Sequence, residues 1–289
     1  MSESRLRPGR VDDVAAIAAF TTDTFSWGDY VAESLPEWLD DEETEVVVAT
    51  GDDDRPVALA RVRMLGPREG WISAARVHPD HRRRGLGSAL NHWCVDWIAG
   101  RGGAVARLQI EAWNEAAHNQ VVAIGYRPVA TVANAVRAIS ASRMEPATNG
   151  GRRAKADERL DRAPHTEAEG AFIAWSTSEL ARAAHGLFPV DRWSWRRMAP
   201  DDTHLGQTWS CPSGWVLAED EEGELTVRWL VANPDDASLL VRATVDLAHE
   251  RQAEGIHLIV PAVDWLLAAV ESNGFQTHPT RIYEKPISR

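Results

Sequence analysis

The sequence predicts an α/β (α+β) protein built from two similar halves. Short β-branched runs bounded by turn residues alternate with segments of helical period. The order of these segments recurs after about 150 residues, as expected of an internal duplication, with chance recurrence as the competing interpretation. The length of 289 residues fits two domains of ordinary size, and 44% hydrophobic with 26% charged residues excludes wholesale disorder.

In the first half, glycines and acidic turns separate the expected elements. Gly51-Asp52-Asp53-Asp54 is the turn of a hairpin, and Gly100 with Gly102-Gly103 ends a long helix. Acids in the first turn favour a helix at the start of the chain. The expected elements are a helix over 11–20, strands over 45–50, 56–65 and 71–77, a helix over 86–99, a strand over 104–113, a helix over 115–124 and a final strand or hairpin over 128–139.

The later half repeats this order after a polar stretch. Residues 140–170 contain few large apolar side chains, which predicts a linker that ends in a short helix. Trp193-Ser194-Trp195 favours a strand with one buried tryptophan face over a nucleic-acid contact. The expected elements are strands over 215–218 and 224–231, a helix over 236–254, a strand over 256–260, a helix over 264–272 and a strand over 281–284.

Charge and composition narrow the class of function. With 31 basic and 43 acidic residues the chain carries a formal net charge of −12. This charge disfavours nucleic acid as a partner and favours a cationic small molecule. The start of the chain has no apolar segment and no run of 18 apolar residues occurs, so no membrane partner is expected and the expected location is cytoplasmic. Cys94 and Cys211 form no disulfide framework, and Cys94 between tryptophans is expected to be a buried, inert thiol.

The segment from Val77 to Leu90 carries the richest chemistry, because it joins an expected strand to an expected helix. Gly85 and Gly87 let the backbone approach a ligand and point its N–H groups at one place. The start of the helix adds positive potential, and Arg82, Arg83 and Arg84 add donors for phosphate. The segment is therefore interpreted as a pyrophosphate cradle.

Two nucleotide motifs do not fit this segment. A Walker loop requires a lysine, which the segment lacks, and a dinucleotide fingerprint requires a small residue where Leu90 stands. His78 and His81 suggest a metal, but no third ligand lies near in sequence, so no metal is expected.

In these residues the chain resembles the GNAT superfamily of N-acetyltransferases, over about residues 5–139 and more loosely in the later half. The family signature Arg/Gln-x-x-Gly-x-Gly/Ala after Val-x-Pro, and its Asn-x-x-Ala with a later Gly-aromatic pair, both occur here. The matching residues are Val77, Pro79, Arg82, Gly85, Gly87, Asn114, Ala117, Gly125 and Tyr126, with Gly274-Phe275 and 281–285 in the later half.

The resemblance implies a mixed, centrally splayed sheet in each half, with acetyl-CoA as co-substrate and a primary amine as acceptor. The pantetheine arm of acetyl-CoA would lie between strands 71–77 and 104–113, which splay apart. The residues implied to bind the cofactor are Val77, Arg82, Arg83, Arg84, Gly85, Leu86, Gly87, Ser88, Ala89 and Asn114.

The corresponding loop of the later half departs from the signature. Residues 231–239 contain no arginine and no glycine, and Asp235 and Asp236 stand where phosphates would bind, which repels them. We therefore expect a tandem protein with a GNAT-like acetyl-CoA-binding domain over 1–140, a linker over 141–170 and a degenerate GNAT-like domain over 171–289.

The general acid and base are harder to assign. Many members of the family carry a tyrosine seven residues after the asparagine, where this chain has Val121. His118, one helical turn earlier, is the candidate acid, with water or direct transfer as alternatives. Glu111 is the candidate base; Glu69, Ser73 and an ordered water are the alternatives, and a strand glutamate at a solvated edge is the bland interpretation.

The acceptor site has two interpretations. Acids over 23–43 interleave with Trp27, Tyr30 and Trp38, which suits a cationic amine, although a solvated acidic helix face is the competing interpretation. The expected activity is N-acetyl transfer from acetyl-CoA to a primary amine of a small molecule by direct attack on the thioester. The alternative, favoured by Val121, is a non-catalytic acyl-CoA sensor or structural module. A monomer or homodimer is expected.

Overall fold

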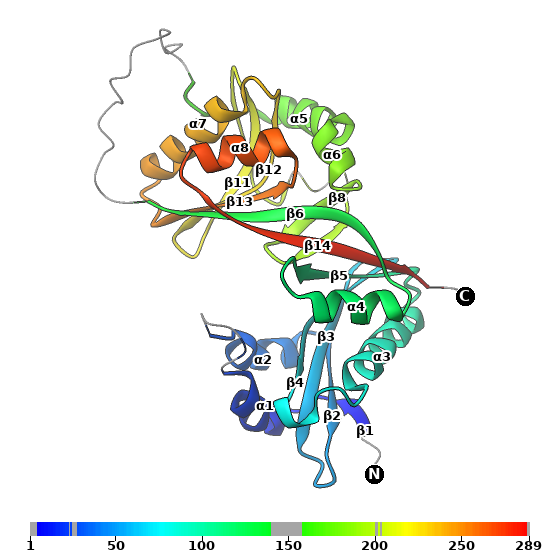
Figure 1. Cartoon of the computed structure of the whole chain (residues 1–289). Coiled ribbons are helices and arrows are strands. Elements are labelled where there is room, and N and C mark those ends of the chain that lie inside the picture. Colours follow the sequence, from blue (N-terminus) through cyan, green and yellow to red (C-terminus); the bar gives the residue numbers. More distant parts are fainter. Residues whose placement is uncertain are drawn as a thin grey trace. The chain divides into compact units, whose positions relative to one another are not determined.

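The computed structural model describes residues 5–22, 24, 28–139, 158–199, 202 and 204–287. The chain forms two compact units, coloured along the sequence in Figure 1. Unit 1 comprises Met1–Ile110, Asn114–Arg127 and Tyr283–Arg289, and unit 2 comprises Glu111–Trp113 and Pro128–Ile282. Among the described residues, no helix is long and apolar enough to cross a membrane.

Unit 1 is a mixed sheet with the strand order β1-β2-β3-β4-β5, followed by the end of β14. Strands β1 to β4 are antiparallel neighbours, and β5 runs parallel to β4. The elements are β1 (Arg5–Pro8), the 3-10 turn η1 (Val11–Asp13), α1 (Val14–Thr21), α2 (Val31–Asp40), β2 (Thr44–Thr50), β3 (Pro56–Gly66), β4 (Glu69–Val77), the 3-10 turn η2 (Pro79–His81), α3 (Leu86–Gly100), β5 (Val105–Glu111) and α4 (Glu115–Ala123).

Both faces of this sheet are covered, because its strands are apolar on both sides. Along β2, Val46 and Val48 pack with residues of α1 and α2, whereas Val47 and Ala49 pack with residues of α3 and α4. Alternate residues of a strand point to opposite faces, so the two helix pairs lie on opposite sides. Cys94 is fully buried in the second of these cores, and burial raises the pKa of its thiol, as expected of an inert cysteine.

The sheet of unit 1 opens between its parallel strands, which confirms the expected central splay. Registered pairing joins Glu69 to Val105, Gly70 to Ala106 and Trp71 to Arg107. Beyond Trp71, β4 continues to Val77 and β5 continues to Glu111 without further registered pairs. We call this opening the fork.

Unit 2 has the strand order β14-β6-β13-β12-β11-β10-β7, with a separate hairpin of β8 and β9. As in unit 1, a hairpin, a long helix, a parallel strand and a short helix follow one another. The elements are β6 (Arg127–Ala138), β7 (Asp161–Arg162), α5 (His165–Thr177), α6 (Glu179–Ala183), β8 (Leu187–Asp191), β9 (Ser194–Arg197), β10 (Gln207–Cys211), β11 (Gly214–Glu221), β12 (Glu224–Ala232), α7 (Ala237–Glu250), β13 (Gly255–Pro261), α8 (Asp264–Ser272) and β14 (Gln276–Pro286).

The two units exchange strands. β6 follows α4 in the sequence, yet from Pro128 onward it belongs to unit 2 and pairs with β13. β14 follows α8, yet its end from Tyr283 belongs to unit 1. Each exchanged strand caps a short helix: Lys285 Nζ donates to Ile124 O at 2.9 Å after α4, and Arg137 Nη1 donates to Asn273 O at 2.5 Å after α8.

The expected elements of both halves form. The elements that were not predicted lie where the periodicity of hydrophobic residues is weak. Sequence reading did not predict β1, α2 as a defined helix, or most of the elements from β7 to β10. Within the expected linker, residues 140–157 lie outside the described residues, while β7 and the start of α5 are ordered elements of unit 2. Trp195 is buried on β9, as the strand interpretation expects, whereas Trp193 precedes the strand and is exposed, so the expected buried face holds one tryptophan and not both. The domain boundaries at 140 and 171 stay predictions.

Candidate functional site

The loop between β4 and α3 is held by its own side chains. Arg82 Nε donates to Val77 O at 3.2 Å, and Arg84 Nη2 donates to Asp80 O at 2.9 Å. The backbone N–H of Asp80 donates to His78 Nδ1 at 3.2 Å. The loop is therefore shaped before any ligand is present, while Arg82, Arg83 and Arg84 remain exposed.

The two signature glycines serve different needs. Gly85 precedes α3 with φ of 81°, in the left-handed region that L side chains rarely adopt, although a Cβ there would meet nothing within 4 Å. At Gly87 the need is space, because a Cβ would lie 2.5 Å from Gln120 Nε2 on α4. Glycine is therefore required at position 85 by the backbone conformation and at position 87 by the close packing of α3 against α4.

Backbone donors gather at the start of α3. The bond from Ala89 N to Gly85 O, 3.0 Å long, is the first of the helix, so the N–H groups of Leu86, Gly87 and Ser88 precede its internal bonding. These donors and the positive end of a 15-residue helix suit a pyrophosphate. The residues present thus fit the phosphates of acetyl-CoA.

The fork continues from this loop along β4. A bulge shifts the register between β3 and β4, and Ala74 within it has φ of 53°. After the bulge, Val77 is half-buried at the end of β4. Backbone groups of β4 beyond Trp71 are not used in pairing with β5, which leaves that edge able to bind an extended chain such as a pantetheine arm.

Asn114 has a structural role that explains its spacing to Ala117. It is the N-cap of α4, and its Oδ1 accepts the backbone N–H of Ala117 at 3.2 Å. The helix ends at Ala123, and Gly125, with φ of 93°, then leads the chain to the buried Tyr126. A contact between Asn114 and the cofactor stays a prediction.

His118 is buried and bonded. Its Nδ1 lies 2.9 Å from the Oη of Tyr283, which β14 brings into unit 1. Both side chains are less than 5% exposed. Val121, which stands where many members of the family carry a tyrosine, is buried in an apolar core that also contains Tyr283. Sequence reading missed Tyr283 as a partner, since 165 positions separate the two residues.

The candidate base, Glu111, is the last residue of β5 and is assigned to unit 2, and its role as base stays a prediction. Its carboxyl is half-buried; burial raises its pKa, and His278 partly offsets this shift. Of the alternatives, Glu69 forms an ion pair with Arg107, and Ser73 lies half-buried beside the bulge of β4.

The acids before β2 mostly form a solvated face. Glu33, Glu37 and Asp40–Glu43 are exposed, whereas Trp38 is buried. Asp29 is the exception: its side chain is buried, and Arg76 of β4 binds it at 2.7 and 3.2 Å. Asp23 and Trp27 lie outside the described residues. The geometry of α2 thus favours the solvated-face interpretation.

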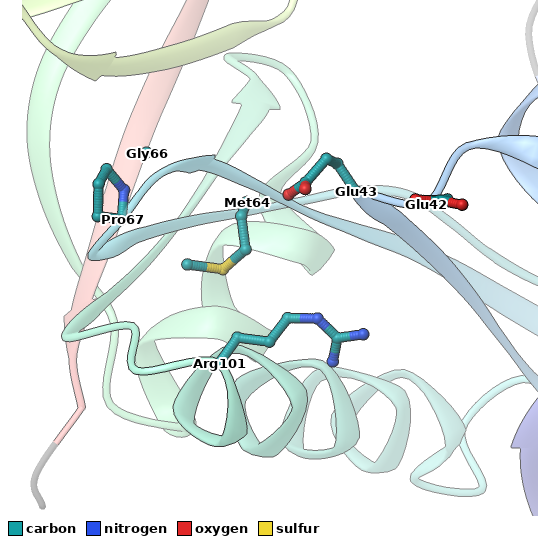
Figure 2. Close-up of a pocket in the computed structure, with 6 residues that line it drawn as sticks. All are labelled: Glu42, Glu43, Met64, Gly66, Pro67 and Arg101. Carbon is teal, nitrogen blue, oxygen red and sulfur yellow. The ribbon is translucent and has the colours of Figure 1, made fainter.

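Two cavities are lined by described residues of unit 1. One of about 450 Å³ lies against His78 and His81. The other, of about 390 Å³, is lined by Glu42, Glu43, Met64, Gly66, Pro67 and Arg101; Figure 2 shows Met64 directed toward Arg101. It adjoins the start of β4, about 27 Å along the strand from the cradle loop. No metal site is formed by acidic, histidine or cysteine groups within the described ranges.

The loop of unit 2 that corresponds to the cradle is shorter and acidic. Residues 233–236 join β12 to α7, and the first bonds of α7 run from Leu239 N and Leu240 N to Asp236 O. Asp235 is exposed at this helix start. A carboxylate here occupies the positive potential that a phosphate would need.

Unit 2 also buries a neutral histidine. His257 of β13 is 4% exposed, and its Nε2 lies 3.3 Å from Asn134 Oδ1. Among the described residues, its Nδ1 has no hydrogen-bond partner. Burial, with Arg192 and His278, lowers the pKa of His257 to about 3.

We expect this histidine to make the protein sensitive to acid. The unfolded state takes up a proton below its ordinary pKa of 6.5, while the folded state stays neutral to about 3, so stability falls as pH drops through that window. The loss is at most about 1.4 kcal/mol per pH unit. Urea unfolding at pH 7 and pH 5 measures it: His257→Gln is expected to flatten the decline, unlike His92→Gln at an exposed position. Equal declines in wild type and His257→Gln contradict this.

Comparison with known proteins places this geometry in a family. Residues 14–125 match the acetyltransferase (GNAT) family. A GCN5-related N-acetyltransferase from Sphaerobacter thermophilus shares 17% identity, a TM-score of 0.66 and coverage of 99% of this chain and 96% of that chain. A tandem GNAT protein from the clavulanic acid biosynthesis pathway shares 12% identity, a TM-score of 0.59 and coverage of 99% of both chains. A putative acetyltransferase from Thermoplasma acidophilum shares 16% identity and a TM-score of 0.59, with coverage of 98% of this chain and 100% of that chain.

No curated protein matches the sequence. At the identities of the solved structures, their likeness concerns the fold, which covers both units of this chain. The family match covers the segment that contains the cradle loop, α3, β5 and α4. Residues 14–125 therefore match the acetyltransferase (GNAT) family, in a chain with the fold of tandem GNAT proteins.

Proposed function

We propose that unit 1 binds acetyl-CoA and transfers its acetyl group to a primary amine of a small molecule. The observation that carries the proposal is the set of backbone donors of Leu86, Gly87 and Ser88 at the start of α3, beside the fork. Arg82, Arg83, Arg84 and Gly85 would hold the pyrophosphate with them, and Ala89 continues the helix behind. Val77 would contact the pantetheine arm.

The transfer needs little side-chain chemistry. The amine nitrogen attacks the thioester carbonyl, a C–N bond forms, the C–S bond breaks and the thiolate takes up a proton. A backbone N–H near Val77 would polarise the carbonyl. Glu111 is the proposed base, since burial raises its pKa and so makes its carboxylate a better proton acceptor than a solvated one. His118 is the proposed acid, supported by its bond to Tyr283.

Unit 2 is proposed to hold no cofactor, since its shorter loop lacks glycine and carries Asp235 and Asp236. Calorimetric titration with acetyl-CoA tests both statements and is expected to give one site per chain. Two sites contradict the degeneracy of unit 2, and no binding at millimolar acetyl-CoA contradicts the cofactor assignment.

A non-catalytic acyl-CoA sensor is the second candidate, favoured by the buried Val121 in place of a tyrosine. Release of free thiol from acetyl-CoA, followed while a panel of amino sugars, polyamines and amino-acid derivatives is offered, separates the two. An enzyme turns over with one of these acceptor classes, whereas a sensor binds acetyl-CoA and releases no thiol with any of them.

A further inference from the structure

A buried ion cluster lies where the fork begins. Trp71 and Arg107 form the last registered pair of β4 and β5, and the Arg107 side chain is 3% exposed. Its Nε and Nη2 both bind Glu284 Oε2 at 2.9 Å, and its Nη1 binds Glu69. Arg107 therefore ties β5 to β4 on one side and to β14 on the other.

A buried cluster of charges is an unusual way to hold strands together. Removing charges from water is costly, and apolar residues of similar volume often stabilise a core equally well. A guanidinium differs from an apolar side chain in its geometry, because its planar donors fix two carboxylates at set positions. Arg127, mostly exposed, lies 3.6 Å from Glu284 Oε1 and adds a second positive charge.

We propose that Arg107, Glu69 and Glu284 are positioning residues that hold the fork open for the pantetheine arm. The inference rests on the proposed function. Beyond the cluster, the edges of β4 and β5 carry backbone donors and acceptors that would pair with each other if the strands approached. The cluster sets the residue at which pairing stops. Because Glu284 comes from β14, the last strand of the chain is part of the cofactor site of unit 1.

Binding of two ligands separates this role from general stability. CoA carries the arm, whereas adenosine 3′,5′-diphosphate keeps a phosphorylated nucleotide and lacks the arm. Glu284→Leu removes one side of the cluster and leaves Arg107 paired with Glu69. We expect it to weaken CoA tenfold or more by calorimetry and to change the affinity of the diphosphate less than twofold. Glu284→Gln, which keeps the shape and an acceptor, is expected to restore most of the affinity.

Arg127→Met is the matched control, since Arg127 contacts the same glutamate from an exposed position, and neither affinity should change. If Glu284→Leu does not fold, Glu69→Leu breaks the other side of the cluster. Equal weakening of both ligands, or no weakening of CoA, overturns the positioning role while the cofactor assignment stands. A wild-type protein that binds neither ligand overturns both.

Discussion

Replacement of Gly85 by aspartate is expected to weaken acetyl-CoA binding by more than 100-fold. The residue has φ of 81°, so any side chain strains the backbone there by about 1–2 kcal/mol. The carboxylate would also stand beside the N–H groups of Leu86, Gly87 and Ser88, where the pyrophosphate is proposed to bind. Two like charges about 4 Å apart near a protein surface repel by roughly 4 kcal/mol. Calorimetric titration of both proteins measures the loss.

The chain offers a closely matched control at the other end of α3. Gly102 has φ of 82°, and a Cβ there would also meet nothing within 4 Å. Gly102→Asp therefore adds the same charge and the same backbone strain, away from the proposed phosphates. Gly85→Ala separates the two effects, because it strains the backbone without adding charge, and about a tenfold loss is expected. If Gly102→Asp weakens binding as much as Gly85→Asp, the cradle assignment is wrong.

The strand, loop and helix start around the proposed cradle were predictable because their causes are local. A strand, a run of arginines, two glycines and a helix start follow one another within Val77–Ala89, and each residue acts on its neighbours. The same locality explains why α8 was predicted with its observed bounds, Asp264–Ser272. Capping residues and apolar period determine such an element from within.

The exchange of strands was not predictable from such patterns. β6 has the composition of a final strand of the first half, and its sequence does not say whether it pairs with its own half or with β13. The bond between Arg107 and Glu284 spans 177 positions, so no spacing rule connects them. Periodicity assigns residues to elements and faces, but it does not assign partners to a strand.

Ending the chain after Ile282 is expected to abolish acetyl-CoA binding and to destabilise unit 1. Three contacts are lost together: Tyr283 with His118, Glu284 with Arg107, and Lys285 with the carbonyl that ends α4. Removing one partner of a buried ion pair alone costs about 3–5 kcal/mol. Thermal unfolding and calorimetric titration measure both effects. Ending the chain after Ile287 is the control, because these contacts remain, and it should behave as wild type.

The same contacts distinguish two hypotheses: that residues 1–140 form a domain by themselves, and that unit 1 needs the end of β14. If residues 1–140 form a self-sufficient domain, that fragment folds and binds acetyl-CoA. If unit 1 needs β14, the fragment leaves the buried Arg107 without Glu284 and leaves β5 as an open edge beside an unpartnered β6. It is then expected to aggregate or to bind more than 100-fold more weakly. Affinity within threefold of the full chain contradicts the need for β14, because no residue after 140 would then contribute to the cofactor site.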